Sequence, residues 1–426
     1  MDMEERLQLI LSLVDQISDK RDELIEIAVR DIGFTYKDTS HEVDLVIRCL
    51  KNFKNDIKFL ENGKPICERG KEVAIISPYN GSAWLNVSIA SVFLAGNNVR
   101  VRFSSKDFAI AIFFEKIYRE IFDDAIKFDY RSGDEFMSYA INSPKVKAIV
   151  AFGSDRTFLR YEDAVRNVKR KFIFEGPGND PFIVLSDANL ELAVNDLVSS
   201  KYMYSGQACI APERIYVQEE IYDDFLREFV DLTKSLIVGD PKNPETDVGP
   251  VVSKKAIENI KKQLIDAERK GARIVYGGKI EGNYPTIVVD ANHSMLGMRE
   301  EVFGPVCYVC KFKTPEEIIN LARDSKYGLR ATIYEKREGK IIAEALKGAD
   351  YLEEVEDYTF GKFGTVSLNE PLSEGWRDAL VTKPVGGYGY SGWVWDFVGK
   401  FRIRQGPKLF SIETSIADLG DVTCTR

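Results

Sequence analysis

The stretch YSGQACIAPER, residues Tyr204–Arg214, places one cysteine where it could act as a nucleophile. Cys209 has small neighbours and follows a glycine and a glutamine, so a substrate carbonyl could approach its sulfur. A cysteine attacks as the thiolate, and a free thiol has a pKa of about 8.5. Activation therefore requires a helix N-terminus, a cation or a nearby base. The residues alone leave two interpretations open, a nucleophile or a packing thiol, because cysteine is among the most buried residue types.

Partner groups for this thiol are scarce. The chain has two histidines, His41 and His293, and both lie among polar residues far from Cys209 in the sequence. We expect both to occupy solvated surface positions, and we predict no metal site. Cys307 and Cys310 form a C-x-x-C, but the run PVCYVCKF is typical of a strand, where residues three apart point to opposite faces. These two thiols are therefore expected to pack in the core.

Length and composition limit the number of domains and disfavour several classes of partner and location. The chain has 426 residues, 44% hydrophobic and 29% charged, with a net charge of -9. That length allows two or three domains, and the acidic balance disfavours nucleic acid and membranes as partners. The start lacks the regions of a signal peptide, and no apolar run could span a bilayer. Six cysteines in so long a chain form no disulfide framework, so a cytoplasmic location is predicted.

Hydrophobic spacing predicts an α/β architecture. Apolar residues at helical spacing predict two helices in the first segment, ending near Gly33. From Val73 to Glu175, short β-rich runs alternate with longer helical runs, and the alternation restarts at Pro181. Such alternation is the pattern of βαβ units on a parallel sheet. We therefore expect two Rossmann-like parallel-sheet domains, with the boundary near residues 175–185.

One glycine-rich run requires separate interpretation. GGYGYSG contains a formal G-x-G-x-x-G at Gly387, Gly389 and Gly392. A dinucleotide fingerprint needs a buried strand before it, a helix after it and an acidic residue about 20 positions on. These are missing here, so we interpret the run as a tight loop.

Nine stretches resemble motifs of the NAD(P)-dependent aldehyde dehydrogenase superfamily. Residues 172–194, FIFEGPGNDPFIVLSDANLELAV, resemble the family's E-L-G-G-K-S-P-x-I-V-x-x-D-A-D-L run, and YSGQACIAPER is similar to G-Q-x-C-x-A-x-x-R. EEVFGPV looks like E-E-x-F-G-P-V. The other stretches are ISPYNGSAWL, LAGNNVRVRFSS, KAIVAFGS, VGDPKNPETDVGPVVS, KYGLRATIY and KPVGGYGYSG. They keep the family order along most of the chain.

The resemblance implies three catalytic residues. Cys209 matches the nucleophile, which attacks the aldehyde carbon to give a thiohemiacetal and then a thioester. Glu175 matches the general base that activates water to hydrolyse this thioester. Asn80 matches the side-chain amide of the oxyanion hole, with the Cys209 backbone N–H as its partner. The implied reaction is oxidation of an aldehyde to the carboxylic acid with NAD(P).

The resemblance also implies a cofactor site. Glu301 matches the carboxylate that holds the nicotinamide ribose, and Arg102 takes the place of a lysine at the adenosine ribose. The implied set is Ser77, Pro78, Tyr79, Arg102, Ser104, Ser105, Gly133, Gly153, Ser154, Gly176, Glu301 and Phe303. Ser105 stands where a glutamate often selects NAD. Loss of that negative charge, with arginines nearby, favours NADP or dual use.

Several positions depart from the family pattern. Pro177 removes a backbone N–H near the nicotinamide, Asn179 replaces a lysine, and Tyr79 replaces a tryptophan. Small residues at Gly81, Ser88 and Val385 favour a roomier or more polar substrate pocket.

Two alternatives stay open. A relative that transfers the acyl group to CoA often lacks the base glutamate, so Glu175 favours hydrolysis. The other alternative is a non-catalytic member that acts as a binding or structural protein. It is motivated by the glycine turn, where the family's E-L-G-G has become Glu175-Gly176-Pro177-Gly178.

A division of the chain follows from the same resemblance. Residues 1–177 are expected to bind the dinucleotide, with 385–405 returning to that unit, and residues 178–384 to form the catalytic domain. Residues 406–426 would supply an oligomerisation strand or tail. The segment FLENGKPICERGKEV has no room for the family's oligomerisation hairpin, so that element is reduced. We expect a homodimer or higher homo-oligomer that acts on a small-molecule aldehyde.

Overall fold

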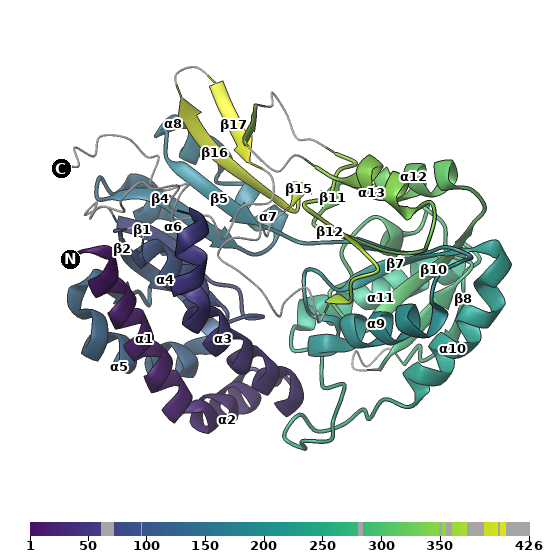
Figure 1. Cartoon of the computed structure of the whole chain (residues 1–426), viewed down its shortest axis with the longest axis horizontal. Coiled ribbons are helices and arrows are strands. Elements are labelled where there is room, and N and C mark those ends of the chain that lie inside the picture. Colours follow the sequence, from purple (N-terminus) through teal and green to yellow (C-terminus); the bar gives the residue numbers. More distant parts are fainter. Residues whose placement is uncertain are drawn as a thin grey trace.

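The protein is built around two large sheets that lie in separate halves of the molecule (Figure 1). The computed structural model describes residues 1–60, 72–94, 96–279, 284–348, 352–354, 360–372, 387–398 and 401–405. Both sheets have parallel strands at their centres with helices packed around them, so the predicted α/β class with two Rossmann-like sheets is confirmed. None of the helices in these ranges is long and apolar enough to cross a membrane.

The first sheet has eight strands in the order β13-β17-β16-β5-β4-β1-β2-β3. Its strands are β1 (Glu72–Ile76), β2 (Asn98–Arg102), β3 (Ile126–Phe128), β4 (Val146–Phe152), β5 (Lys171–Glu175), β13 (Leu352–Glu354), β16 (Gly392–Val398) and β17 (Phe401–Gln405). The helices of this half are α1 (Met3–Asp19), α2 (Arg21–Asp31), α3 (Tyr36–Leu60), α4 (Leu85–Leu94), α5 (Phe108–Phe122), α6 (Gly133–Asn142), α7 (Asp155–Leu159) and α8 (Glu162–Asn167). Strands β1 to β5 pair in parallel, and β16 pairs antiparallel with β5.

The second sheet has seven strands in the order β14-β12-β6-β7-β10-β9-β8. Its strands are β6 (Asp180–Val184), β7 (Pro212–Gln218), β8 (Arg273–Tyr276), β9 (Thr286–Val289), β10 (Val306–Phe312), β12 (Arg330–Tyr334) and β14 (Thr365–Leu368). Its helices are α9 (Leu190–Tyr202), α10 (Tyr222–Lys234), α11 (Lys254–Arg269), α12 (Pro315–Arg323) and α13 (Gly339–Leu346). A short pair, β11 (Tyr327–Gly328) and β15 (Tyr388–Gly389), lies between the two large sheets (Figure 1).

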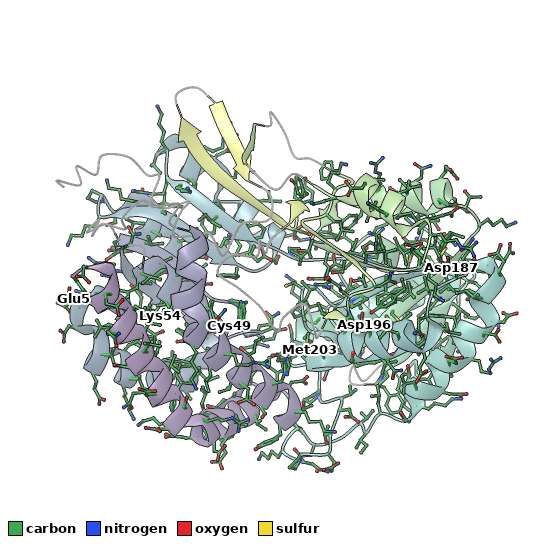
Figure 2. The ribbon with its side chains drawn as sticks, in the orientation of Figure 1. Glu5, Cys49, Lys54, Asp187, Asp196 and Met203 are labelled. Carbon is green, nitrogen blue, oxygen red and sulfur yellow. The ribbon has the colours of Figure 1, made fainter. Side chains whose placement is uncertain are left out.

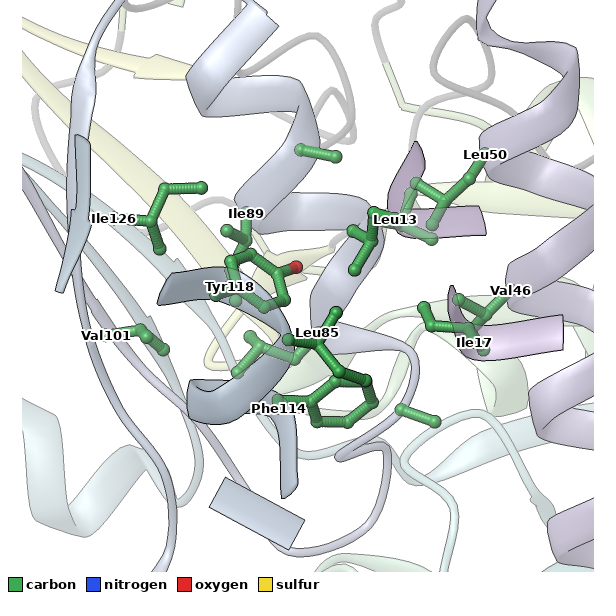
Figure 3. Packing of buried hydrophobic residues seen from close by; sticks show 14 of the residues in the cluster. Leu13, Ile17, Val46, Leu50, Leu85, Ile89, Val101, Phe114, Tyr118 and Ile126 are labelled. Atoms are coloured by element: carbon green, nitrogen blue, oxygen red, sulfur yellow. The ribbon is translucent and has the colours of Figure 1, made fainter. Parts of the chain in front are cut away.

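Helical spacing in the first segment produces a core rather than a surface layer. The packed cluster joins α1, α3, α4 and α5 to strands β2 and β3, and its members are almost fully buried (Figure 3). Those labelled in the figure are Leu13, Ile17, Val46, Leu50, Leu85, Ile89, Val101, Phe114, Tyr118 and Ile126. Two of the three leading helices were predicted. The third, α3, runs from Tyr36 to Leu60 and contributes residues to the site described below.

The chain passes from the first sheet to the second between Glu175 and Asp180. Late in the sequence it returns, because Gly392 on β16 pairs with Glu175 on β5. The division into a cofactor unit and a catalytic unit stays a prediction. Residues 61–71, 373–386 and 406–426 lie outside the described residues, and with them most of the expected reduced hairpin and the expected terminal oligomerisation strand.

The C-x-x-C pair lies on strand β10, as predicted. Cys307 is fully buried and packs with one cluster of core residues, whereas Cys310 packs against the cluster on the other face of the sheet. The described cysteines, Cys49, Cys209, Cys307 and Cys310, are all free thiols. The expectation of core packing for Cys307 and Cys310 is confirmed.

The prediction of a solvated surface position for His293 is wrong. One ring nitrogen lies 2.8 Å from the Tyr216 hydroxyl and the other 2.8 Å from Asp324, and only 14% of the side chain is exposed. The reason is tertiary: strand β7 brings Tyr216 beneath the loop that carries His293.

Candidate active site

A cavity of about 680 Å³ lies between the two halves of the molecule. Loops that follow strands of the first sheet form one wall, and the segments around Cys209 and Glu301 form the other. Crevices at the carboxyl ends of parallel strands are where α/β proteins bind ligands, and the volume suits a small molecule. Eleven of the fifteen predicted site residues line this cavity: Pro78, Tyr79, Asn80, Ser104, Gly153, Ser154, Glu175, Gly176, Cys209, Glu301 and Phe303.

The remaining four predicted residues lie outside the cavity lining. Ser77 is buried, and its hydroxyl donates to the Pro78 carbonyl at 2.7 Å. Arg102, at the end of β2, donates from Nε to the carbonyl of Arg131 at 3.1 Å. A Cβ on Gly133 would lie 3.9 Å from the Arg102 guanidinium carbon, so these two residues adjoin each other. Ser105 follows Ser104 on the surface and so extends this group from the cavity rim.

The turn before Cys209 is held in an unusual backbone conformation. Tyr204, Ser205 and Gly206 have φ angles of 50°, 56° and 72°, in the left-handed region that suits glycine. Such a conformation costs on the order of 1–3 kcal/mol for a residue other than glycine. A Cβ on Gly206 would lie only 2.2 Å from the carbonyl oxygen of Gly304, so the turn before Cys209 and the Glu301–Gly304 turn make direct backbone contact.

Gln207 fixes this turn, and the sequence analysis did not assign it a role. Its amide nitrogen donates to the carbonyls of Tyr204 at 3.0 Å and Pro250 at 3.1 Å, and its amide oxygen accepts the Val252 N–H at 2.9 Å. The Gln207 carbonyl accepts a hydrogen bond from Asn80 Nδ2 at 3.0 Å. Asn80 is therefore tied to the segment that carries Cys209. The glutamine of the G-Q-x-C motif was the available signal.

The turn of residues 175–178 packs directly on Cys209. Strand β5 ends at Glu175, whose carbonyl accepts the Gly153 N–H at 3.1 Å. A Cβ on Gly178 would lie 2.0 Å from the carbonyl oxygen of Cys209, so only glycine permits this approach. The turn therefore brings the carboxyl of Glu175 and the thiol of Cys209 into the same cavity.

Electrostatics in the cavity favour neutral forms of both groups. Burial raises the pKa of the Cys209 thiol well above its usual value, and the carboxyls of Glu175, Glu301 and Asp180 raise it further. Burial likewise raises the pKa of Glu175 well above its usual value, with Asp180 adding to the shift. Both carboxyl oxygens of Glu175 are buried without a hydrogen-bond partner in the described part of the protein. Burial without a hydrogen-bond partner disfavours the charged form of this carboxyl.

Helix α3 contributes three lining residues that the sequence analysis did not assign, His41, Glu42 and Leu45. Glu42 accepts the Trp84 N–H at 2.9 Å and the Tyr204 hydroxyl at 3.4 Å, and so links α3 to the turn before Cys209. The side chain of His41 is exposed at this cavity, so the predicted solvated position of His41 is confirmed. These residues are far from Cys209 along the chain, which is why spacing did not reveal them.

The substrate-pocket expectation is met only in part. Gly81 lines the cavity, but Ser88 is fully buried and does not, and Val385 lies outside the described residues. Trp84 and Met203 supply apolar bulk to the lining instead. Met203 lies on the half that carries the second sheet, close to the middle of the molecule (Figure 2).

Comparison with known proteins identifies the family. The family model described as "Aldehyde dehydrogenase family" matches residues 1–403. The chain belongs to the aldehyde dehydrogenase family. It is 32% identical over 366 residues to a D-glyceraldehyde dehydrogenase (NADP(+)) of Thermoplasma acidophilum, covering 80% of this chain and 73% of the relative. It is also 28% identical over 367 residues to a lactaldehyde dehydrogenase of Methanococcus maripaludis, covering 82% of this chain and 77% of the relative.

Solved structures agree with this assignment. An aldehyde dehydrogenase from Brucella melitensis superposes with a TM-score of 0.83 at 26% identity, over 97% of this chain and 83% of that one. A lactaldehyde dehydrogenase from Escherichia coli gives a TM-score of 0.81 at 25% identity, over 96% and 85% of the two chains. The enzyme is thus an oxidoreductase that acts on aldehydes with NAD(P).

The residues present fit a nicotinamide dinucleotide. Gly153, with φ of 148°, exposes bare backbone beside Ser154 on the cavity wall. The Tyr79 hydroxyl is buried without a partner among the described residues and so has unused hydrogen-bonding capacity. Arg102 at the rim offers a cation to a phosphate, and Glu301 offers a carboxylate to sugar hydroxyls. The donor set therefore matches both the phosphates and the ribose of such a cofactor.

Proposed function

We propose that the enzyme oxidises an aldehyde to the carboxylic acid through a thioester on Cys209, which is hydrolysed by water that Glu175 activates. One observation carries this proposal: a free thiol, an unpartnered carboxyl and a side-chain amide line a single cavity between two Rossmann-like sheets. Acyl chemistry on cysteine needs these three groups, as nucleophile, base and oxyanion donor.

In the first stage, Cys209 Sγ attacks the aldehyde carbon while the thiol proton passes to a carboxylate, for which Glu175 is the available group. The developing oxyanion is held by Asn80 and by the Cys209 backbone N–H. Asn80 has two amide hydrogens. Gln207 accepts one of them, which leaves the second for the oxyanion. When bound, the oxidised nicotinamide supplies the hydride acceptor and a positive charge.

In the second stage, the acyl group is a thioester of Cys209. Glu175 first releases to solvent the proton that it took from the thiol. As the carboxylate, it then takes a proton from water whose oxygen attacks the thioester carbon. The carboxylic acid leaves and the sulfur is released as thiolate. The raised pKa of Glu175 supports this role, because the conjugate base of a weaker acid takes a proton from water more readily.

NADP is the proposed cofactor. The alternative within this proposal is an enzyme that uses both NADP and NAD. Glu301, Ser104, Gly153 and Ser154 would hold its nicotinamide ribose and pyrophosphate. Arg102 would face the 2′-phosphate, since its guanidinium makes one backbone hydrogen bond and no ion pair among the described residues. The relative from Thermoplasma acidophilum is described as NADP-dependent, which supports this preference.

Small hydroxyaldehydes are the proposed substrates. The relatives above act on D-glyceraldehyde and lactaldehyde, as their names state. His41, Glu42 and Asn80 give the cavity polar groups that suit substrate hydroxyls. A pocket built to bond a hydroxyl rejects an analogue that lacks it more strongly than an apolar pocket rejects a change of size.

The test is an aldehyde panel followed at 340 nm with NAD and with NADP. We expect turnover of glyceraldehyde and lactaldehyde without CoA, and none in the Cys209→Ala variant. The matched control is Cys310→Ala, since Cys310 is also a half-buried free thiol but lies away from the cavity. Cofactor affinity of Cys209→Ala, measured by equilibrium titration, should stay within about twofold of the wild-type value, because the thiol is not proposed to hold the cofactor.

Other outcomes would favour the alternatives. Turnover only with CoA would assign the acyl-transferring reaction. Tight cofactor binding without oxidation of any aldehyde would assign a non-catalytic role, and full activity in Cys209→Ala would refute the assigned nucleophile. A cytoplasmic location and homo-oligomeric assembly remain predictions, which cell fractionation and light scattering would test.

A further inference from the structure

We propose that Glu213 is a positioning residue, which fixes the turn that carries Glu301 and Phe303 and thereby shapes the nicotinamide end of the cofactor site. This inference rests on the proposed function. Glu213 does not line the cavity, and the sequence analysis gave it no role. It lies on strand β7 four residues after Cys209 and is 1% exposed.

The Glu213 carboxylate is shared between two separate turns. Its Oε1 accepts the backbone N–H groups of Val302 and Phe303, each at 2.9 Å. Its Oε2 also lies 2.9 Å from the Val302 nitrogen and accepts Asn179 Nδ2 at 2.9 Å. One buried side chain therefore holds the Glu301–Phe303 turn against the turn that follows Glu175.

The backbone at Phe303 needs such support. Its φ is 53°, which is costly for a bulky residue and persists only where the surroundings impose it. Its N–H donates to Glu213, and its ring lies edge-on to Tyr79 with 6.1 Å between ring centres. Phe303 and Tyr79 both line the cavity, so the supported backbone sets a wall of the site.

Glu301 is placed by the same arrangement although Glu213 does not touch its side chain. The Glu301 carboxylate accepts the Gly178 N–H at 3.1 Å, and its carbonyl accepts Gln263 Nε2 at 3.1 Å. Val302, which follows Glu301, and Asn179, which follows Gly178, are the residues that bond to Glu213. Loss of this link would loosen the backbone next to each of the two residues, Glu301 and Gly178, that form this contact.

Lys201 gives Glu213 a second role that an experiment can separate. Lys201, on α9, is fully buried, and its Nζ has no hydrogen-bond partner in the described ranges. Burial lowers its pKa, and Glu213 is the group that most offsets this effect. Removing one charge of a buried pair leaves the other uncompensated and destabilises the protein. Glu213 thus balances a charge and also accepts the hydrogen bonds of the turn.

The experiment compares Glu213→Gln, Lys201→Met and the double variant. A glutamine keeps the size of the side chain but has one acceptor oxygen, and its NH₂ group would face N–H donors. We expect Glu213→Gln to lower the melting temperature and to weaken NADPH binding at least about tenfold, measured by equilibrium titration without aldehyde. The KM for NADP should rise likewise, while the KM for aldehyde changes less than about twofold.

The double variant carries neither charge, so its melting temperature should recover toward the wild-type value. Its NADPH affinity should remain as weak as in Glu213→Gln, because the acceptor is still missing. Recovery of affinity together with melting temperature would overturn the positioning role and leave only charge balance. Wild-type affinity in Glu213→Gln would overturn it as well.

These results are distinguishable from failure of the proposed function. A wild-type protein that binds neither NADPH nor NADH would refute the cofactor site itself, and the inference with it. A wild-type protein that binds NADPH, alongside a Glu213→Gln variant that binds equally well, refutes the positioning role alone.

Discussion

Replacement of Glu175 by glutamine should slow deacylation and at the same time change how stability depends on pH. The variant keeps the shape of the side chain but can neither take a proton from water nor titrate. General-base catalysis contributes typically about 10²–10⁴-fold to a rate. We expect the steady-state rate of Glu175→Gln to fall by about that factor, and the acyl group to accumulate on Cys209.

The stability effect follows from the environment of the carboxyl. Burial and Asp180 raise the pKa of Glu175 in the folded protein, so between the unfolded and folded pKa the folded state binds one proton more than the unfolded state. The wild type therefore loses stability as pH rises through that window, by about 1.4 kcal/mol per pH unit for one proton. Glu175 is 6% exposed, so water screens this pH-dependent contribution to the free energy of unfolding only little. A glutamine does not titrate and makes no such contribution.

The assay has two readouts. Mass spectrometry after mixing with aldehyde and cofactor should find the acyl adduct on the peptide that contains Cys209. Melting curves taken at rising pH from pH 5 should show Glu175→Gln gaining on the wild type until pH reaches the folded pKa of Glu175. The expected gain is roughly 3–6 °C per pH unit, for a domain of about 200 residues. Glu258→Gln, a change at an exposed carboxylate on α11, is the control that should do neither.

Three results would refute this reasoning. An adduct on a cysteine other than Cys209 would remove the assigned nucleophile. Wild-type turnover in Glu175→Gln would remove the assigned base. Parallel melting curves for the variant and the wild type across this pH range would show that Glu175 titrates in the folded protein as it does in the unfolded chain.

Two further predictions concern the cofactor and helix α3. Arg102→Ala should weaken NADPH about 10-fold to 100-fold, since a charge-assisted bond contributes about 1.5–3 kcal/mol, and should leave NADH unchanged; equal losses for both would exclude a 2′-phosphate contact. Burial raises the pKa of Asp38 to about 7, where it accepts the Tyr204 N–H and the Thr35 hydroxyl. The wild type should therefore lose stability from about pH 4 to pH 7, and Asp38→Asn should lose less, by a few degrees of melting temperature.

The elements were predictable because their signals are local. Alternating β-rich and helical runs predicted the two parallel sheets. Short motifs resembling those of the family matched Cys209, Glu175 and Asn80 to its catalytic positions. The spacing of residues 307 and 310 gave opposite faces of a strand without knowledge of its neighbours. In each case the physical cause, backbone periodicity or motif chemistry, acts over a few positions.

The rest of the site depends on contacts between distant segments. Glu42 bonds to Tyr204 across 162 residues, and Glu213 bonds to Phe303 across 90. No periodicity reports such pairings, since they exist only after the two sheets have packed. The same reason explains His293, which a polar local sequence suggested would be solvated and which instead bonds to Tyr216, 77 residues away.

The departures from the family pattern in the turn after Glu175 are mutually consistent. The N–H that Pro177 lacks is not needed to hold the turn, because Gly176 donates to Ser391 at 2.8 Å and Ser391 Oγ donates to the Pro177 carbonyl at 2.5 Å. Gly178 then donates to Glu301, which joins the turn to the cofactor wall.

Asn179 connects this turn to a buried carboxylate in the core. Its amide donates to Glu213, a carboxylate that already has the buried charge of Lys201 nearby. A lysine at position 179 would add a second buried cation to one carboxylate, and an uncompensated buried charge is strongly destabilising. A neutral donor satisfies the same oxygen without that cost. The proline and the asparagine therefore preserve the turn's connections to Cys209 and Glu301.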